Sequence, residues 1–165
     1  MLRLILMRHA KSDWSHAGIS DHERPLNARG RAAALALGGW LRSNSYGVDQ
    51  VLCSTATRTR ETLECLALDP SPETGFTRSL YLAEARAMME TLHTAKFPRV
   101  LMLGHNPGIC EMAHRLLDDP PTHRRFEDYP TGATLVCDFD AADWDMINWH
   151  DGRIVDFIVP RDLTD

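Results

Sequence analysis

Residues 2–9, LRLILMRH, set the architecture of this chain. The first six of them are apolar except for one arginine, and a continuous apolar run of this length predicts a buried β-strand. Strands that are apolar on both faces are typical of parallel sheets covered by helices. The strand leads directly into Arg8 and His9, so it would place a guanidinium and an imidazole at its carboxyl end.

Short apolar runs alternate with amphipathic stretches along the rest of the chain, and this pattern predicts an α/β fold. The clearest helix begins after Asn27, a preferred N-cap residue, and continues to about Ser43 with apolar residues at helical spacing. Predicted strands cover residues 2–7, 51–53, 76–80, 100–103, 133–139, 145–149 and 154–159, and predicted helices begin after Asn27, after Ser54 or Thr55, near Ala85 and at Pro107.

The C-terminal part of the chain predicts antiparallel pairing. Asp151-Gly152 lies between the extended stretches 145–149 and 154–159, and Asp-Gly between apolar runs is the sequence signal of a β-hairpin. We therefore expect a mostly parallel sheet with an antiparallel C-terminal edge. The polar segment 118–131 is expected to be a loop, and whether it gates a site is left open.

Size and composition predict a single domain, residues 1–165, because the chain has 165 residues, 44% of them apolar and 25% charged. The net charge is −5 and no basic run is present, which argues against a nucleic-acid partner. The apolar runs are too short to span a membrane, and the N-terminus lacks a signal-peptide pattern. With four widely separated cysteines we expect reduced thiols and a cytoplasmic protein.

Residues suited to phosphate chemistry follow three of the predicted strands. Arg8 and His9 follow the first strand, Ser54 and Arg58 follow the second, and His105 follows the fourth. The carboxyl ends of parallel strands lie at one edge of a sheet, so we expect these side chains to converge there. Arginines bind tetrahedral anions, and a neutral histidine can act as a nucleophile toward phosphorus. The pattern predicts phosphoryl transfer, whereas a dinucleotide site is not expected because no Gly-x-Gly-x-x-Gly follows the first strand.

Four short motifs follow one another along the chain: LMRHA at 6–10, RPLNARG at 24–30, STATRTRET at 54–62 and LGHNPG at 103–108. Together they resemble the motifs of the histidine phosphatase superfamily, the phosphoglycerate-mutase-like proteins. The second motif resembles a segment of the short SixA-type phosphohistidine phosphatases. The likeness covers about residues 4–109, and Thr55 stands where the family usually has a proline.

The resemblance implies a phosphoglycerate-mutase-like fold, which is a three-layer αβα sandwich around a mostly parallel sheet. It also implies roles for the matching residues. His9 would be the nucleophile and would form a phosphohistidine intermediate, while Arg8, Arg58 and His105 would complete the catalytic phosphate pocket. Arg24 matches a further phosphate-contacting arginine of the SixA-type enzymes. Neither a metal nor another cofactor is implied.

The proton donor is less clearly marked in the sequence. Mutase-like relatives use an acidic residue between the second and third motifs, and Glu84 stands near that place. Asp13, Glu23 and Glu90 are alternatives. SixA-type enzymes have no evident acid, which suits phosphohistidine because imidazole leaves phosphorus far more readily than an alkoxide does.

The sequence therefore predicts a metal-independent phosphohydrolase whose substrate is phosphohistidine in a protein. One alternative is a phosphatase of small phosphate monoesters that uses Glu84 as general acid, and another is a non-catalytic module that binds phosphorylated ligands. A mutase is less expected, because the sequence shows no extra basic wall for a second phosphate. Neither a nucleic acid nor a membrane is expected as a partner, and the oligomeric state is left open.

Overall fold

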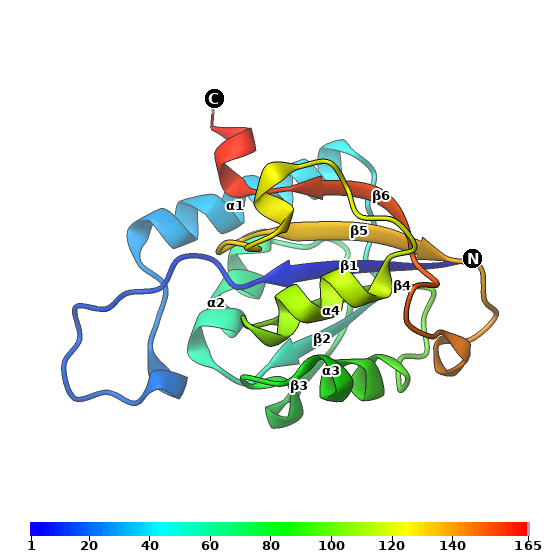
Figure 1. Ribbon diagram of the computed structural model, residues 1–165. Helices are drawn as coiled ribbons and strands as arrows, with labels where there is room; N and C mark the ends of the chain where they lie inside the picture. The colour runs from blue at the N-terminus through cyan, green and yellow to red at the C-terminus, as the bar shows by residue number, and fades with distance from the viewer. Residues whose placement is uncertain (165) are drawn as a thin grey trace.

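The computed structural model describes residues 1–164, which form a six-stranded sheet with helices on both sides (Figure 1). The strand order is β3-β2-β4-β1-β5-β6, so the N-terminal strand lies inside the sheet, as its apolar sequence predicts. The strands are β1 (Leu2–Arg8), β2 (Gln50–Ser54), β3 (Glu73–Thr77), β4 (Arg99–Gly104), β5 (Thr134–Phe139) and β6 (Arg153–Ile158), and the α-helices are α1 (Ala28–Ser43), α2 (Thr57–Leu66), α3 (Ala85–Leu92) and α4 (Gly108–Leu116).

The direction of the strands is mostly parallel. β3, β2, β4 and β1 run parallel to one another, whereas β5 runs antiparallel to both of its neighbours, β1 and β6. The expectation of antiparallel pairing at the C-terminal edge is thereby confirmed. In Figure 1 the arrows of β1 and β2 point to the same side of the molecule, where the long loop after β1 begins.

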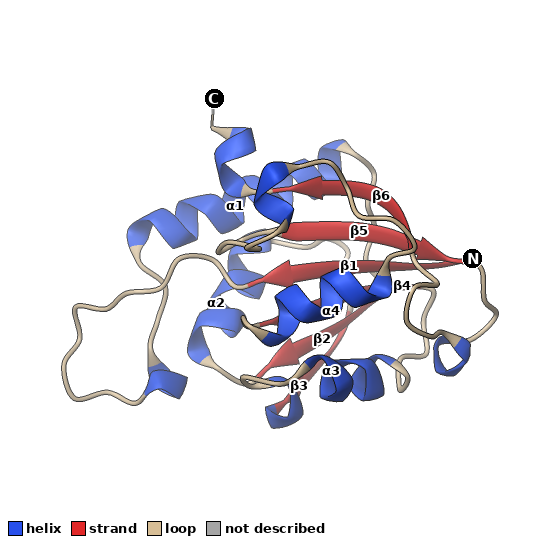
Figure 2. Ribbon diagram, in the orientation of Figure 1, coloured by secondary structure: helices blue, strands red, loops and turns tan. Residues whose placement is uncertain are grey.

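Each face of the sheet has its own apolar core, because successive side chains of a strand point to opposite faces. Leu4 and Leu6 of β1 cluster with buried residues of α3 and α4. Ile5 and Met7, on the opposite face, cluster with buried residues of α1 and α2. The result is the three-layer αβα sandwich that the resemblance implies (Figure 2). None of the helices within residues 1–164 is long and apolar enough to cross a membrane.

The start of α1 agrees with the prediction and ties the site to the helix. The side-chain oxygen of Asn27 accepts a hydrogen bond from the Gly30 N–H at 2.8 Å. The Asn27 N–H donates to the carbonyl oxygen of Lys11 at 3.0 Å, so the chain beyond β1 is held against the first turn of α1. A Cβ atom at Gly30 would lie 2.0 Å from that carbonyl oxygen, and only glycine permits so close an approach.

The predicted C-terminal hairpin is wrong, because residues 145–149 do not form a strand and β6 pairs with β5 instead. Trp144–Met146 is a 3₁₀ helix. Trp144 and Ile147, three residues apart, are both buried, and the Trp144 indole N–H donates to the carbonyl oxygen of Phe97 at 2.6 Å. Three-residue spacing matches a 3₁₀ turn rather than a strand, so the packing of these two side chains overrides the local Asp-Gly signal.

Two other boundaries differ from the prediction. α2 begins at Thr57, later than expected, because Ser54 is still paired with β3 as the last residue of β2. β3 covers residues 73–77 rather than 76–80. The difference arises because Leu80 is buried within a 3₁₀ turn that directly follows the strand. In both places a tertiary contact, the pairing of Ser54 with β3 or the burial of Leu80, sets the boundary.

Candidate active site

His9 and His105 leave the carboxyl ends of two neighbouring strands. Arg8, the last residue of β1, lies opposite Gly104, the last residue of β4. The His9 backbone N–H donates to the Gly104 carbonyl oxygen at 3.2 Å. The two imidazole rings consequently lie side by side, with their centroids 5.3 Å apart. Parallel pairing of β1 with β4 thus unites two motifs that are far apart in the sequence.

The surroundings of His9 leave one ring nitrogen available for chemistry. Its Nδ1 lies 2.7 Å from the carbonyl oxygen of Ala10. Since a carbonyl oxygen can only accept a hydrogen bond, Nδ1 carries the proton and Nε2 keeps its lone pair. Burial, together with the positive charges of Arg8 and Arg58, lowers the pKa of His9 to about 3. His9 is therefore a neutral imidazole at neutral pH.

His105 is held by the end of β2. Its Nε2 lies 2.8 Å from the hydroxyl oxygen of Ser54, which also accepts a hydrogen bond from the Ala56 N–H at 3.3 Å. Burial, and then the charge of Arg58, lower the pKa of His105 to about 3. Its Nδ1 is buried and has no hydrogen-bond partner within residues 1–164. If the Ser54 hydroxyl donates to Nε2, the proton of the neutral ring lies on Nδ1.

Three arginines surround the two histidines. Arg8 donates a hydrogen bond to the carbonyl oxygen of Tyr129 at 3.2 Å, and Arg24 donates to the Ser12 hydroxyl. Burial, together with the charge of Arg58, lowers the pKa of Arg8. The buried Nε atoms of Arg8, Arg24 and Arg58 have no hydrogen-bond partner among residues 1–164. Three guanidinium cations therefore line the same pocket as the two imidazoles, and guanidinium groups suit a tetrahedral anion.

Asp21, which the sequence analysis did not single out, lies between two of these arginines. Its carboxylate accepts hydrogen bonds from Arg24 at 2.9 Å and from Arg58 at 3.0 Å, and a third from the Tyr81 hydroxyl. Burial acts to raise the pKa of Asp21, but these three hydrogen bonds outweigh it and hold the pKa below its ordinary value. The local signal was its position three residues before Arg24, in the turn-rich segment after β1.

These side chains line one pocket with a volume of about 330 Å³. The five histidines and arginines that the motifs predicted for phosphate binding all lie in it, together with Asp21. The segment after β1, which extends from the body of the molecule in Figure 1, provides one wall. The lining residues are Arg8, His9, Lys11, Ser12, Trp14, Asp21, Arg24, Arg58, Leu82, His105, Asn106 and Thr131.

The structure does not bring Glu84 into this pocket. Glu84 is exposed at the N-terminus of α3 and is not among the lining residues. Asp13, Glu23 and Glu90 are likewise absent from the lining. The acidic side chain that does line the pocket, Asp21, is ionised at neutral pH because its pKa is lowered. Within residues 1–164 no three His, Cys, Asp or Glu side chains are grouped as a metal site.

Comparison with known proteins identifies the family. The profile described as "Histidine phosphatase superfamily (branch 1)" matches residues 4–84. An uncharacterized protein of Mycobacterium tuberculosis is 36% identical over 162 residues, which cover 94% of this chain and 100% of the relative. The chain belongs to the histidine phosphatase superfamily. The superfamily and the phosphatase class inferred from the four motifs are thereby confirmed.

Solved structures place this histidine phosphatase near the SixA group. A candidate phosphohistidine phosphatase SixA from Nakamurella multipartitia has a TM-score of 0.84 and 27% sequence identity, over 96% of both chains. A candidate SixA from Agrobacterium tumefaciens has a TM-score of 0.77 and 25% identity, over 96% of this chain and 98% of that one. The αβα architecture of this histidine phosphatase is therefore that of the phosphoglycerate-mutase-like fold, as expected.

Proposed function

We propose that this protein is a metal-independent phosphohydrolase that removes phosphate from phosphohistidine in proteins, with His9 as the nucleophile. One observation carries the proposal. The Nδ1 proton of His9 is bound to the Ala10 carbonyl oxygen, so the neutral ring keeps a lone pair on Nε2 in a pocket lined by three arginines. A neutral imidazole is the form that can attack phosphorus.

The first step transfers the phosphoryl group to the enzyme. Nε2 of His9 attacks phosphorus as the P–N bond to the substrate imidazole breaks. The substrate ring, protonated on its other nitrogen, takes the bonding electron pair and leaves as neutral imidazole. Arg8, Arg24 and Arg58 stabilise the charge on the three transferring oxygens, and His105 contributes a further N–H donor. In the second step, water attacks the phosphorus, the bond from phosphorus to His9 breaks, and inorganic phosphate is released.

The choice of phosphohistidine over a phosphate ester rests on the acid that each leaving group needs. An alkoxide needs a proton donor, and general-acid catalysis contributes typically 10²–10⁴-fold. The pocket-lining carboxylate, Asp21, is ionised and cannot serve as that donor at neutral pH. Imidazole leaves without such help, and the names of the two SixA-like structures point to the same substrate class.

The second candidate, a phosphatase of small monoesters, keeps Glu84 as its general acid. Leu82 lines the pocket only two residues before Glu84, so a shift of this segment could bring the carboxyl group closer. Hydrolysis of phosphohistidine does not need this shift, because its leaving group needs no general acid. The two candidates therefore differ in what the replacement of Glu84 by glutamine does to turnover.

The deciding experiment measures phosphate release from a phosphohistidine-bearing protein in excess EDTA, with p-nitrophenyl phosphate as the ester substrate. We expect fast release from phosphohistidine, a poor ester rate, loss of both activities in His9→Ala, and little change in Glu84→Gln. His16→Ala, which replaces an exposed histidine, serves as control. A preference for the ester that Glu84→Gln abolishes would favour the monoester phosphatase. Phosphate binding without any turnover would favour the non-catalytic module.

A further inference from the structure

A second pocket of about 230 Å³ adjoins the proposed catalytic pocket. The two pockets share Lys11 and Thr131, which line both. The new pocket draws its other residues from α1, from the loop before β5 and from the C-terminal end of the described chain. They are Arg29, Ala33, Arg125, Pro130, Val159, Pro160 and Arg161.

The charge of this second pocket is entirely positive, because four cations and no acidic side chain line it. Arg125 is neutralised by Asp128, which it contacts through two hydrogen bonds at 3.1 and 3.0 Å. The side chains of Lys11, Arg29 and Arg161 form neither an ion pair nor a hydrogen bond with any part of residues 1–164. On a chain with a net charge of −5, three such cations around one pocket form a local basic wall.

Backbone contacts hold the shared wall in place. The Lys11 carbonyl oxygen is fixed against Asn27 and Gly30 at the start of α1. On the other side, the Gly132 N–H donates to the His9 carbonyl oxygen at 2.9 Å. A Cβ at Gly132 would lie 2.5 Å from the ring of Pro160, so this turn packs directly on the C-terminal segment. Both walls are thus connected to the backbone of His9.

The position of Arg29 has an electrostatic cost that an anion would relieve. Arg29 lies in the first turn of α1, where the helix dipole disfavours a positive charge. No acidic residue occupies that turn to compensate. An anion bound beside Arg29 would interact favourably with both the guanidinium and the N-terminal end of the 16-residue helix.

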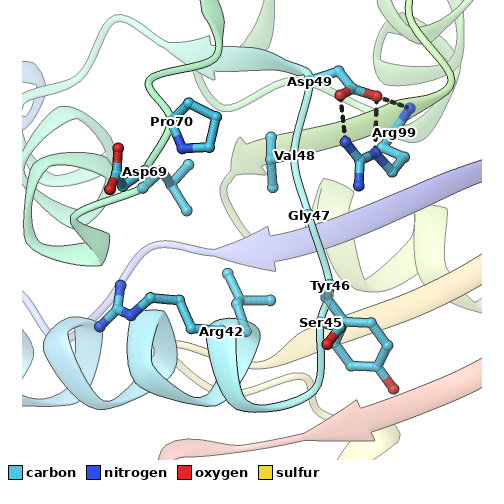
Figure 3. A pocket seen from close by; sticks show the side chains of 11 residues that line it. Arg42, Ser45, Tyr46, Gly47, Val48, Asp49, Asp69, Pro70 and Arg99 are labelled. Atoms are coloured by element: carbon cyan, nitrogen blue, oxygen red, sulfur yellow. Dashed lines mark hydrogen bonds and ion pairs between the residues drawn. The ribbon is translucent and has the colours of Figure 1, made fainter.

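A third pocket, at the amino ends of β2 and β4, shows how arginines lie when the protein itself supplies their partners (Figure 3). That pocket, of about 320 Å³, also contains two arginines. Figure 3 shows Arg99 bound to the carboxylate of Asp49, with distances of 3.0 and 2.7 Å. Arg42 donates to the carbonyl oxygens of Leu66 and Ala67. Its cations are already satisfied within the protein, whereas those of the basic pocket are not.

We propose that the basic pocket binds a second anionic group, a phosphate or a carboxylate, of the same substrate whose phosphoryl group enters the catalytic pocket. The inference rests on the proposed function for the position of that phosphoryl group and adds a determinant of specificity. The pocket also corrects the expectation from the sequence that no basic wall for a second phosphate lies beside the catalytic pocket. Lys11, Arg29 and Arg161 are scattered in the sequence, so no basic run announced them.

The protein-borne source is tested with two phosphohistidine peptides, one flanked by aspartates and one by asparagines. We expect the acidic peptide to have about tenfold higher kcat/KM, mainly through KM, as one charge-assisted contact would give. In the double variant R29Q/R161Q this ratio should fall to near one. The control R86Q/R153Q removes two exposed arginines that do not line the pocket and should keep the ratio.

The small-molecule source is tested by calorimetric titration with propane-1,3-diol bisphosphate and with propyl phosphate. Tighter binding of the bisphosphate in the wild-type protein, lost in R29Q/R161Q, supports the pocket even if no phosphohistidine peptide is hydrolysed. In that case the proposed function fails and the subsite stands. If neither the peptide pair nor the phosphate pair is distinguished, or if both preferences persist in R29Q/R161Q, the proposal is overturned.

Discussion

The chemistry available to His9 and His105 follows from what each ring touches. Both rings are buried beside arginines, and both have a pKa lowered to about 3. A cationic imidazole would be repelled by those arginines and could not attack phosphorus. The same burial that keeps His9, the proposed nucleophile, neutral also makes the stability of the fold depend on pH.

The first prediction concerns stability against pH. Because the folded protein lowers the pKa of both histidines from 6.5, the unfolded chain binds more protons below about pH 6.5. The free energy of unfolding should therefore fall as the pH falls from 6.5 toward 3, by at most about 1.4 kcal/mol per pH unit for each histidine. Urea unfolding at pH 7 and pH 5 measures the difference.

The variant His105→Gln removes one of the two histidines that make the free energy of unfolding depend on pH. Its loss of stability between pH 7 and pH 5 should be smaller than that of the wild type by up to about 2 kcal/mol. His16→Gln, at an exposed position, should behave as the wild type. An unchanged pH dependence in His105→Gln would mean that His105 titrates normally in the folded protein.

The second prediction concerns Asp21, whose carboxylate occupies N–H donors of Arg24 and Arg58. In Asp21→Asn the amide oxygen can still accept from these donors, but the negative charge that competes with a phosphate anion for them, and repels it, is removed. We expect inorganic phosphate to bind about tenfold more tightly, measured by calorimetry, because charged hydrogen bonds contribute about 1.5–3 kcal/mol. Asp13→Asn, in the same segment but outside the pocket lining, is the matched control. Weaker phosphate binding in Asp21→Asn would instead make Asp21 a positioning residue for the arginines.

At the scale of elements, two contacts position the site. One is the register of β1 with β4, and the other is the contact between the loop after β1 and the start of α1. Arg8 lies opposite Gly104, so His9 and the residue after Gly104 leave the sheet at the same level. The loop after β1 then returns to the start of α1, where Gly30 accommodates the Lys11 carbonyl oxygen. The position of His9 therefore depends on a glycine that never touches the pocket.

The third prediction compares two glycines of α1. In Gly30→Ala the new Cβ would lie 2.0 Å from the Lys11 carbonyl oxygen, so the loop or the helix must move. We expect a loss of about 2–4 kcal/mol in stability and a large loss of activity. In Gly39→Ala the nearest atom is 4.0 Å away, and we expect a gain of about 0.5–1 kcal/mol. Thermal unfolding and phosphohistidine turnover measure both. Equal stability of the two variants would contradict the close contact at Gly30.

At the scale of the whole molecule, the proposed catalytic pocket brings together segments that lie far apart in the sequence. β1, the loop that follows it, α2 and the turn after β4 each contribute a cation or an imidazole. A ligand that bridges these segments binds the folded chain and not the unfolded one. Phosphate should therefore stabilise the whole fold rather than one element.

The fourth prediction measures this coupling. Phosphate at about one hundred times its dissociation constant should raise the free energy of unfolding by about 2.7 kcal/mol. Arg58→Gln should lose most of this stabilisation, because Arg58 lies buried in the pocket. Arg60→Gln, two residues along α2 and exposed, should retain it. Full stabilisation of Arg58→Gln by phosphate would show that the anion binds elsewhere.

Local patterns in the sequence were sufficient to predict most elements. The apolar run 2–7, the cap at Asn27 and the spacing of Ala85, Met88 and Leu92 each identified an element that the structure contains. These features depend on neighbouring residues, so periodicity and capping reveal them. The motifs placed His9 and His105 directly after strands and Arg58 one helical turn beyond a strand, and the structure brings these side chains into one pocket. Their catalytic roles stay predictions.

The sequence by itself determined the α/β class, the family and the histidines and arginines of the candidate site, because each is carried by residues close together in the chain. Only the tertiary structure decided that Asp21 bridges Arg24 and Arg58, that Trp144 turns its segment away from a strand, and that a basic wall adjoins the site. The physical reason is that these features are contacts between distant segments. Their energies arise only when the sheet brings the segments together, and no local spacing encodes which loops will meet.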